Sequence, residues 1–329
     1  MRTLTISKND AGQRLDKFLT KALCDIPPAL LYKGIRKKKI KVNRRRAEGG
    51  QILAEGDTVE LFLPEEFFPR ENGEAAHDLG RITPRLSILY EDDNLLLLDK
   101  RPGVLVHEDE GGRGDTLLTH LQAYLFQKGE YDPAKEQSFA PALCNRIDRN
   151  TGGIVIAAKN AEALRILNEA IRDRTIEKFY LCAVHGIPKP RTALLRGHLI
   201  KNSAENTVRV YDRDPGRGAK EIRTRYRVLA THGSAALCEI ELLTGRTHQI
   251  RAHMAHIGHP LWGDGKYGLN REDRARGYKY QALYSYRLRF SFAREGHALA
   301  YLAGREFRIP PESIYFVAPF FPNGKEERP

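Results

Sequence analysis

The chain has 329 residues, which is enough for about two domains of ordinary size, each with its own hydrophobic core. Hydrophobic residues make up 41% of the chain and charged residues 29%, and this composition excludes a wholly disordered, fibrous or collagen-like protein. Lys and Arg number 54 against 42 Asp and Glu, a formal net charge of +12, so a polyanionic partner is expected. The chain has neither ~18 consecutive apolar residues nor an apolar signal-peptide core at its N-terminus, which predicts a cytoplasmic protein with no membrane partner.

Helix and strand patterns predict a small domain at residues 1–64. Apolar residues recur at helical spacing over residues 15–23, and two prolines that follow suit the first turn of a second helix. A strand is expected over residues 58–63. Residues 65–85 lack periodicity and mix Pro, Gly and charges, which predicts a flexible linker.

The most basic stretch of the chain lies within this small domain, at residues 33–46 (KGIRKKKIKVNRRR). Nine of its fourteen residues are Lys or Arg and none is acidic. Ile40 and Val42 alternate with cations, which predicts a short strand with a buried apolar face and an outward basic face. Because uncompensated cations repel one another, the stretch indicates an anionic partner rather than a merely solvated surface.

Residues 1–64 resemble the S-four-type RNA-binding domain, a small α/β module of ribosomal protein and RNA-modifying enzymes. The resemblance lies in residues 14–19 (RLDKFL), 40–43 (IKVN) and 56–57 (GD). It implies that cations of the second helix and the next strand follow an RNA phosphate backbone, whose contacts give affinity and register but little sequence information. The residues predicted to bind RNA are Arg14, Lys17, Arg36, Lys37, Lys38, Lys39, Lys41, Arg44, Arg45 and Arg46.

Residues 86–329 predict a larger α+β domain, with a mixed, mainly antiparallel sheet and flanking helices. Most of its patterns are short strands. One clear amphipathic helix follows Asn160, a plausible N-cap, and residues 91–94 (EDDN) separate two strand-like runs as a hairpin turn does.

Four stretches of this domain resemble the RluA family of pseudouridine synthases. They are residues 99–107 (DKRPGVLVH), 145–153 (NRIDRNTGG), 178–186 (KFYLCAVHG), and 245–253 (GRTHQIRAH) with 258–261 (GHPL) and 263–268 (GDGKYG). The departures from the family's pattern are Asn145 for His, Ile147 for Leu, Gly152 for Ser, and a proline displaced by one place. The resemblance implies an isomerase that converts uridine in RNA to pseudouridine with no cofactor and no metal.

The resemblance also assigns catalytic residues, namely Asp148, Tyr180 and Arg251. The chemistry needs an ionised carboxylate beside the ribose, acting as nucleophile on the anomeric carbon or as base on the neighbouring carbon. A guanidinium keeps a desolvated carboxylate charged, and a tyrosine ring can stack on the flipped uracil or take part in proton transfer. Arg146 precedes Asp148 by two residues, so on an extended segment it faces the same way and could fill the gap left by an extruded nucleotide.

The expected substrate is ribosomal RNA, most plausibly of the large subunit, and transfer RNA is the runner-up. The protein is expected to act as a monomer. A non-catalytic RNA-binding or ribosome-assembly protein is the main alternative, although such a protein has no use for a carboxylate in a basic groove. Six further cations either extend the RNA-contacting surface or are merely solvated: Arg213, Arg217, Lys220, Arg223, Arg225 and Arg227.

A run of histidines suggests a competing hypothesis, a metal-dependent nuclease. The run consists of His248, His253, His256 and His259, but it contains no H-E-x-x-H motif, and the nearby glycine and proline end any helix there. The simpler interpretation is that Thr247 caps a helix, His248 and Arg251 share its polar face, and the other histidines form ordinary hydrogen bonds.

Overall fold

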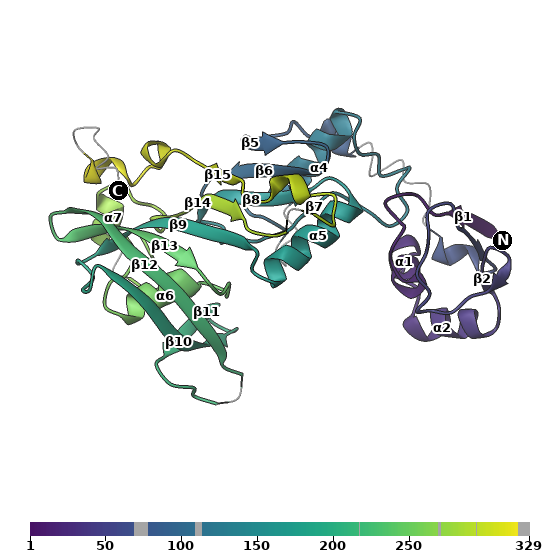
Figure 1. Cartoon of the computed structure of the whole chain (residues 1–329), viewed down its shortest axis with the longest axis horizontal. Coiled ribbons are helices and arrows are strands. Elements are labelled where there is room, and N and C mark those ends of the chain that lie inside the picture. The colour runs from purple at the N-terminus through teal and green to yellow at the C-terminus, as the bar shows by residue number, and fades with distance from the viewer. Residues whose placement is uncertain (69–77, 109–113, 217, 269–270, 294, 322–329) are drawn as a thin grey trace.

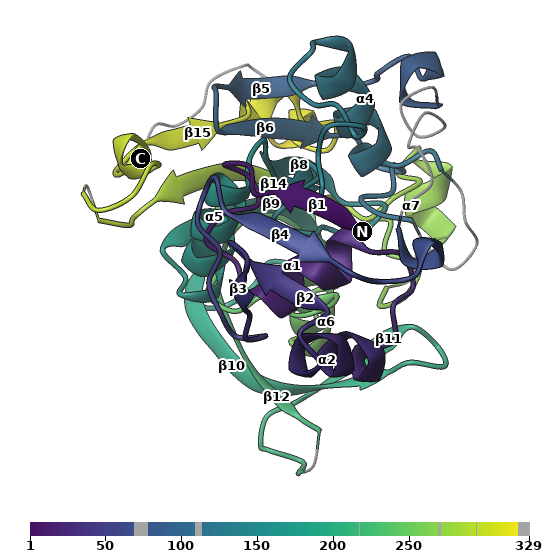
Figure 2. The same ribbon diagram turned by 90° about the vertical axis from the view of Figure 1, so that its right-hand side faces the viewer.

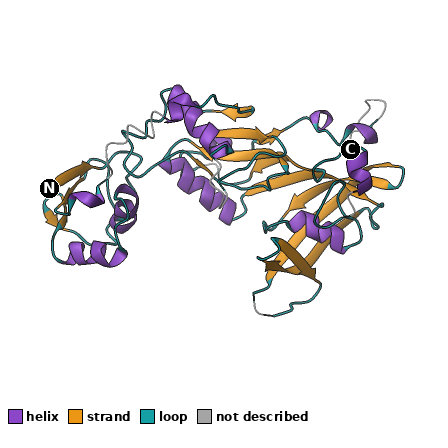
Figure 3. Cartoon of the chain, turned by 180° about the vertical axis from the view of Figure 1, so that it is seen from behind, coloured by secondary structure: helices purple, strands orange, loops and turns teal. Residues whose placement is uncertain are grey.

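The chain forms two domains, each built on a β-sheet with a hydrophobic core of its own (Figure 1). The computed structural model describes residues 1–68, 78–108, 114–216, 218–268, 271–293 and 295–321. One sheet has four strands and the other has eleven, and helices lie on both sides of the larger sheet (Figure 3). The predicted α+β class with a mainly antiparallel sheet is confirmed. None of the helices in the described residues is long and apolar enough to cross a membrane.

The N-terminal domain is built on the four-stranded antiparallel sheet, in the order β1-β4-β2-β3. Its elements are β1 (Arg2–Thr5), α1 (Leu15–Ala22), α2 (Pro28–Arg36), β2 (Ile40–Val42), β3 (Arg45–Arg46), β4 (Thr58–Leu61) and the short 3₁₀ helix η1 (Glu65–Phe67). Both predicted helices and both predicted strands are present. Strand β4 stops two residues short of the predicted end because its partner β1 begins at Arg2, which pairs with Leu61.

Parts of residues 65–85, the range predicted to be a linker, pack on the two flanking domains. Phe68 is buried in the N-terminal core, and the carbonyl of Phe67 accepts a hydrogen bond from the N–H of Cys24 at 2.9 Å. At the other end, the Arg85 guanidinium pairs with Asp115. Residues 69–77 lie outside the described residues.

The larger domain contains the eleven-stranded sheet, with the main order β11-β10-β12-β13-β9-β14-β8-β6-β5. Among the described strands of this sheet, only β14 and β8 pair in parallel. The strands are β5 (Ile88–Glu91), β6 (Leu95–Lys100), β7 (Ala142–Leu143), β8 (Gly152–Ala158), β9 (Ile176–His185), β10 (Thr192–Asn202), β11 (Thr207–Tyr211), β12 (Lys220–His232), β13 (Ala235–Leu242), β14 (Leu283–Phe290) and β15 (Glu306–Arg308). The helices are α4 (Leu117–Gln127), α5 (Ala161–Arg172), α6 (Gln249–His256), α7 (Arg271–Ala275) and the 3₁₀ helices η2 (Ala300–Leu302), η3 (Pro311–Ser313) and η4 (Ala318–Phe320).

Alternating side chains of the central strands cover the sheet on both faces, as strand geometry requires. Leu96 and Leu98 of β6 pack with helix α4, whereas their neighbours Leu95 and Leu97 pack with helix α5 on the opposite face. Helix α6 lies on the α4 face, because Ile147 packs against both the α4 cluster and the α6 cluster. The segment that holds Asp148 therefore runs between α4 and α6.

The predicted helix after Asn160 and the predicted hairpin are both confirmed. Helix α5 begins at Ala161, and the side-chain oxygen of Asn160 accepts a hydrogen bond from the N–H of Ala163 at 2.8 Å. Strands β5 and β6 form the hairpin, and Asp92 Oδ1 accepts from the N–H groups of Asn94 at 2.8 Å and Leu95 at 3.0 Å. Carboxylate acceptors of this kind fix a tight turn.

Candidate active site

Asp148 lies in the loop of residues 144–151 that joins β7 to β8, and we refer to this segment as the Asp148 loop. Asn145 anchors its first half. The buried Asn145 side chain accepts a hydrogen bond from the N–H of Ile156 at 2.7 Å and donates one to the carbonyl of Ile154 at 3.4 Å. Asparagine can make both bonds because its amide is at once donor and acceptor. The residue that departs from the family's pattern thus ties the loop to strand β8.

Two glycines follow the Asp148 loop, at the start of β8, where β8 pairs in parallel with β14. A Cβ atom on Gly152 would lie 2.2 Å from a ring carbon of Tyr284, and one on Gly153 would lie 2.1 Å from the carbonyl oxygen of Ser285. Gly153 also has a φ of 109°, a conformation that side chains disfavour. The Tyr284 ring cannot swing aside freely, since its hydroxyl donates a 2.7 Å hydrogen bond to Asp99. Glycine at position 152 is therefore required by Tyr284.

A buried arginine connects Asp148 to a second carboxylate. Arg251 of α6 donates from Nη1 to Asp148 Oδ2 at 2.9 Å, and from Nε and Nη2 to the two oxygens of Asp264 at 2.7 and 2.9 Å. The side chains of Arg251 and Asp264 are 6% and 0% exposed, whereas that of Asp148 is 27% exposed. The structure thus brings the predicted catalytic pair together, and only its Asp148 end faces solvent.

The charges in this group stabilise one another. Burial opposes the charge on Arg251, but the hydrogen bonds and charges of Asp264 and Asp148 outweigh it and raise the pKa of the guanidinium. Burial alone would raise the pKa of Asp264, yet its bonds with Arg251 and with the N–H groups of Lys266 and Tyr267 hold that pKa below its usual value. Both buried groups are ionised at neutral pH.

His248 lies beside Asp148 at the start of α6. Its Nε2 is 3.8 Å from Asp148 Oδ2, and its Nδ1 is 2.9 Å from the hydroxyl of Tyr267. That hydroxyl accepts from the N–H of Val208 at 2.9 Å, so its own proton goes to Nδ1 and the ring proton of His248 is assigned to Nε2. Burial lowers the pKa of His248 well below its usual value. The ring is therefore neutral, with its N–H toward Asp148.

The two contacts to Asp148 are both made to the same oxygen. Arg251 and His248 face Oδ2, and no residue that the structure describes donates a hydrogen bond to Oδ1. A carboxylate held in this way keeps one oxygen fixed and leaves the other for a substrate. Oδ1 is the atom of the site available for chemistry.

Lys100, the last residue of β6, fixes the backbone beneath the Asp148 loop. Its side chain is buried, and Nζ donates to the carbonyls of Arg101 at 3.1 Å, Val104 at 2.9 Å and Arg149 at 2.9 Å. Three donors thus meet three acceptors. Burial lowers the pKa of Lys100 to about 7, and the charges of Asp148 and Asp99 oppose that shift. The ammonium joins the turn after β6 to the residue that follows Asp148.

Tyr180 lies on the same face of the sheet as α6, in strand β9. It is 5% exposed and packs with Ile250 and Met254 of α6. Burial, together with the nearby charge of Asp148, raises the pKa of Tyr180 to about 12. The hydroxyl is therefore protonated at neutral pH, and it lies close enough to Asp148 to feel its charge.

Arg146 is exposed. It forms no ion pair with any residue in the described ranges, but after burial its charge is the next cause of the lowered pKa of His107. Arg146, which lies within the Asp148 loop, is therefore a near neighbour of His107.

The predicted RNA-binding cations gather on one part of the N-terminal domain. Those of residues 36–39 end helix α2, and those of residues 44–46 lie on the β2–β3 hairpin, all of them exposed. Lys17 is exposed on α1, and Lys41 packs over the ring of Phe62 at 5.5 Å. Two of these cations pair with carboxylates: Arg14 donates to both oxygens of the buried Asp16 at 2.7 and 3.1 Å, and Arg44 Nε lies 3.9 Å from Glu60.

The arginines of β12 lie on the face of the sheet opposite α6. Thr224 and Tyr226 point toward α6, since Thr224 bonds His253 at 3.0 Å and Tyr226 joins the α6 cluster. Strand alternation then places Arg223, Arg225 and Arg227 on the other face. There each pairs with a glutamate, namely Glu221, Glu241 and Glu239. These arginines do not extend the surface around Asp148, and Arg217 lies outside the described residues.

The histidine run does not converge on one point. His248 bonds Tyr267, His253 bonds Thr224, His256 bonds Asp212, and His259 bonds the carbonyl of His185. In the described part of the chain, no group of three or more His, Cys, Asp or Glu side chains is arranged to hold a metal ion. The predicted Thr247 cap is wrong, because α6 starts at Gln249, after His248 in the left-handed conformation with a φ of 53°.

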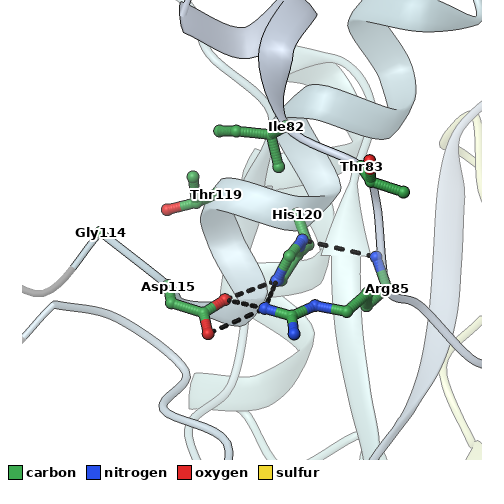
Figure 4. A pocket seen from close by; sticks show the side chains of 7 residues that line it. All are labelled: Ile82, Thr83, Arg85, Gly114, Asp115, Thr119 and His120. Carbon is green, nitrogen blue, oxygen red and sulfur yellow. Dashed lines mark hydrogen bonds and ion pairs between the residues drawn. The ribbon is translucent and has the colours of Figure 1, made fainter.

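A pocket of about 420 Å³ lies at the N-terminal end of α4, and it contains none of the predicted catalytic residues. Figure 4 shows its charged side chains turned toward one another. Arg85 donates to Asp115 at 2.7 and 2.8 Å, and His120 Nε2 lies 2.7 Å from the same carboxylate. Because these groups pair with one another, they hold Arg85, near the start of the larger domain, against helix α4.

Comparisons with known proteins identify the family of the chain. Residues 94–256 match the sequence profile of the RNA pseudouridylate synthase family. "Ribosomal large subunit pseudouridine synthase C" of Haemophilus influenzae is 30% identical over 318 residues, which cover 94% of this chain and 93% of the relative. The chain belongs to the RluA family of pseudouridine synthases.

Other members of the family support the assignment, and two solved structures share the fold. The proteins of the same name from Vibrio cholerae and Escherichia coli are 35% and 32% identical, over 82% and 83% of this chain and 81% and 82% of those relatives. The human RNA pseudouridylate synthase domain containing 1 has a TM-score of 0.52 at 24% identity, covering 70% of this chain and 86% of that one. Its counterpart, domain containing 4, has a TM-score of 0.52 at 22% identity, covering 72% and 90%. These two show that the fold is shared.

The structure adds four residues to the site of this family member that the sequence had not assigned. They are Lys100, His248, Asp264 and Tyr267. All four fall within motifs already recognised, at residues 99–107, 245–253 and 263–268. A buried ionisable residue inside a recognised motif is the signal that could have singled them out.

Asp264→Asn should lower the free energy of unfolding by about 3 kcal/mol at pH 7, since it leaves the buried Arg251 without its main partner. The pKa of Asp264 is lower in the folded chain than its usual 3.8, so its contribution is present above that value and is lost as the pH falls through the folded pKa. Urea unfolding between pH 3 and 7 measures the effect. The difference from wild type should shrink toward pH 3, and a constant difference would contradict the assigned charge.

Lys100→Met should lower the rate of uridine conversion by about tenfold or more, because the Asp148 loop loses a three-way anchor and small displacements of a catalytic group are costly. Steady-state conversion of RNA uridine measures it. Lys159→Met is the matched control, as Lys159 is also buried and pairs with Glu91 and Glu130 away from the site. If the two variants lose the same fraction of their conversion rate, Lys100 contributes to the stability of the fold and not to the position of Asp148.

Proposed function

We propose that this enzyme isomerises specific uridines of large-subunit ribosomal RNA, with Asp148 as its catalytic carboxylate. The observation that supports Asp148 most directly is its geometry. Oδ2 is fixed by Arg251 at 2.9 Å, while Oδ1 is free of donors in the described residues. The names of the bacterial relatives support the large subunit as the source of the substrate.

In the proposed reaction, Oδ1 of Asp148 faces the ribose of an extruded uridine. It acts either as a nucleophile on the anomeric carbon or as a base on the neighbouring carbon, and the bond from the ribose to the ring nitrogen breaks. The detached uracil turns, and ring carbon five bonds to the anomeric carbon while the bond from that carbon to Asp148 breaks or, on the other route, while the proton taken from the neighbouring carbon returns to it. The hydrogen on ring carbon five then leaves as a proton, and the released ring nitrogen takes one up. Arg251 stays charged, because Asp264 and Asp148 raise the pKa of its guanidinium, and it fixes Oδ2 of Asp148 through the 2.9 Å hydrogen bond.

Tyr180 is proposed to position the uracil. Its ring lies on the α6 face of the sheet, where stacking on a flat base is favourable. Because its pKa is about 12, the hydroxyl is a hydrogen-bond donor in the free enzyme, and it can accept the ring proton only after its surroundings change. Arg146, an exposed residue of the Asp148 loop, is proposed to occupy the space that the flipped nucleotide leaves.

We further propose that the N-terminal domain is an S-four-type RNA-binding domain that raises the local concentration of RNA at the larger domain. Its separate core and its exposed cations at residues 36–39 and 44–46 support this role. Long basic side chains at such density bind phosphates through charge, with strong salt dependence.

Asp148→Asn tests the catalytic role. Wild-type enzyme should release tritium from large-subunit ribosomal RNA labelled at ring carbon five of uridine, because isomerisation expels that hydrogen. The variant should release it at least about 10³-fold more slowly, since the amide has neither the charge nor the basicity of the carboxylate. Transfer RNA in a parallel assay tests the runner-up substrate.

Asp173→Asn is the control for this assay, because Asp173 is an exposed aspartate at the end of α5 whose side chain pairs, among the residues described, with Arg172 alone. Its release rate should equal that of wild type. Retained activity in Asp148→Asn would reject the catalytic assignment. Binding of RNA without release by any form would favour the non-catalytic alternative.

A triple charge reversal of Lys37, Lys38 and Lys39 tests the N-terminal domain. RNA affinity should fall, and the slope of log K against log salt should become less steep by about 2 to 3, if each lysine meets one phosphate. Filter binding at several salt concentrations measures both quantities. The exposed position of all three lysines at the end of α2 makes a folding defect unexpected.

The matched control reverses three exposed cations of the larger domain, Arg172, Arg174 and Lys189. It changes net charge equally, so it separates local contact from overall attraction. If both triple variants lose the same slope, the N-terminal cations have no special role in binding.

A further inference from the structure

The N-terminal domain is attached to the larger domain by specific side-chain contacts as well as by the chain itself. Asn9 donates a hydrogen bond to Glu136 Oε1 at 2.9 Å and accepts one from the N–H of Ala161 at 3.3 Å. Ala161 is the first residue of α5, and the first N–H groups of a helix lack partners within the helix. The amide of Asn9 therefore supplies an acceptor that the start of α5 requires.

A buried carboxylate stands at the centre of the same contact. Asp10 is fully buried and accepts hydrogen bonds from Ser7 at 2.8 Å and from Ser138 at 2.6 Å. The Ser138 hydroxyl in turn accepts from the side chain of Gln13 at 2.8 Å. A buried carboxylate without hydrogen-bond donors destabilises the fold. If the N-terminal domain moved away from Ser138, Asp10 would lose one of its donors.

Two further bonds widen the contact. The side chain of Gln137 donates to the carbonyl of Thr5 at 2.6 Å, and Arg165 of α5 donates to the carbonyl of Ala11 at 3.0 Å. We call this set of bonds between residues 5–13 and residues 136–138, 161 and 165 the interdomain contact.

The interdomain contact is polar throughout. Within the described residues, the core of the N-terminal domain draws only on residues 4–68, and the clusters of the larger domain draw only on residues from 86 onward. Hydrogen bonds are directional and apolar burial is not. The orientation of the two domains therefore depends on a few named side chains. Substitutions of these side chains can break the contact without changing either hydrophobic core.

The contact lies at the far end of the sheet from Asp148. Strand β8 has 7 residues, begins just after the Asp148 loop and ends just before α5, so it separates the two sites by roughly 20 Å. In Figures 1 and 2, helix α2 of the N-terminal domain and strands β10 and β12 lie on the same, lower side of the molecule. An RNA bound by the cations at the end of α2 has to extend along the larger domain to reach Asp148.

We propose that the interdomain contact determines substrate specificity by holding the N-terminal domain at a fixed distance from Asp148. A folded RNA segment gripped by the N-terminal domain would then present only a uridine that lies at the matching distance. This inference rests on the proposed function. It assigns to Asn9, Asp10, Gln13 and Ser138 a positioning role in the choice of uridine.

Two variants break the contact in different ways. Ser138→Asp removes a donor and places a second carboxylate against Asp10. The double variant Asn9→Ala with Gln13→Ala removes hydrogen bonds without adding charge. Ser313→Asp places the same new charge on an exposed serine of η3, far from the contact, and serves as control.

Small-angle X-ray scattering measures the domain arrangement independently of activity. Both contact variants should show a larger radius of gyration than wild type and the Ser313→Asp control, because the N-terminal domain becomes free to move. Scattering curves that superimpose on wild type for both variants would overturn the proposal, since the named bonds would not hold the domain.

Conversion is then measured on two RNAs. On full-length large-subunit ribosomal RNA, primer extension after carbodiimide treatment maps each pseudouridine, and the ratio of preferred to other uridines should fall at least about tenfold in the contact variants. On a short hairpin that carries only the preferred uridine and its loop, tritium release should stay within about twofold of wild type.

The outcomes separate the two proposals. Active variants with an enlarged radius and an unchanged preference would overturn the role in specificity while leaving the proposed function intact. Absence of pseudouridine from either RNA with every form, wild type included, would overturn the proposed function and with it this inference. Lower preference with retained hairpin activity supports both.

Discussion

A guanidinium shared by two carboxylates is the interaction on which the active site depends. Arg251 and Asp264 are both buried, and a buried charge without a partner is strongly destabilising. Each of these two charges is therefore stable inside the fold only because the other is present. The Nη1 group of Arg251, which does not contact Asp264, donates to Asp148. The position of the Asp148 carboxylate thus depends on the ion pair between Arg251 and Asp264.

Three anchors of the Asp148 loop keep the partly exposed Asp148 in place. Asp148 comes from a loop, and loops are the least rigid part of a fold. Here the loop is held at Asn145 by β8, at Arg149 by Lys100, and at its end by two glycines under β14. None of these anchors uses the side chain of Asp148. The backbone at Asp148 is therefore fixed while Oδ1 of its side chain stays available.

Much of the fold and of the site followed from the sequence, for different reasons. Amphipathic spacing located α1, α2 and α5, because burial of one helix face leaves a 3.6-residue period. Asp148 and Arg251 were assigned by resemblance, since their separation of 103 residues carries no local signal. Asp264 was not assigned, because its role exists only once α6 and residues 263–268 are side by side. The Thr247 cap failed because His248 takes a left-handed turn that local preference does not favour.

The domain arrangement shows a second limit of sequence reasoning. Residues 65–85 have the composition of a mobile tether, yet the domains also meet through Asn9, Asp10 and Gln13. Small polar residues that bond across a domain boundary leave no periodic pattern and no charge excess, so nothing in their order distinguishes them from ordinary turn residues. Only a structure reveals that they are partners.

The close approach of Gly152 to Tyr284 restricts the order in which this site can evolve. A methyl group at position 152 would overlap a ring that Asp99 holds in place. A lineage that gains a side chain at position 152 must therefore first replace the aromatic ring at position 284 by something smaller. The reverse order passes through a protein whose Asp148 loop is displaced, so one of the two mutational routes is closed.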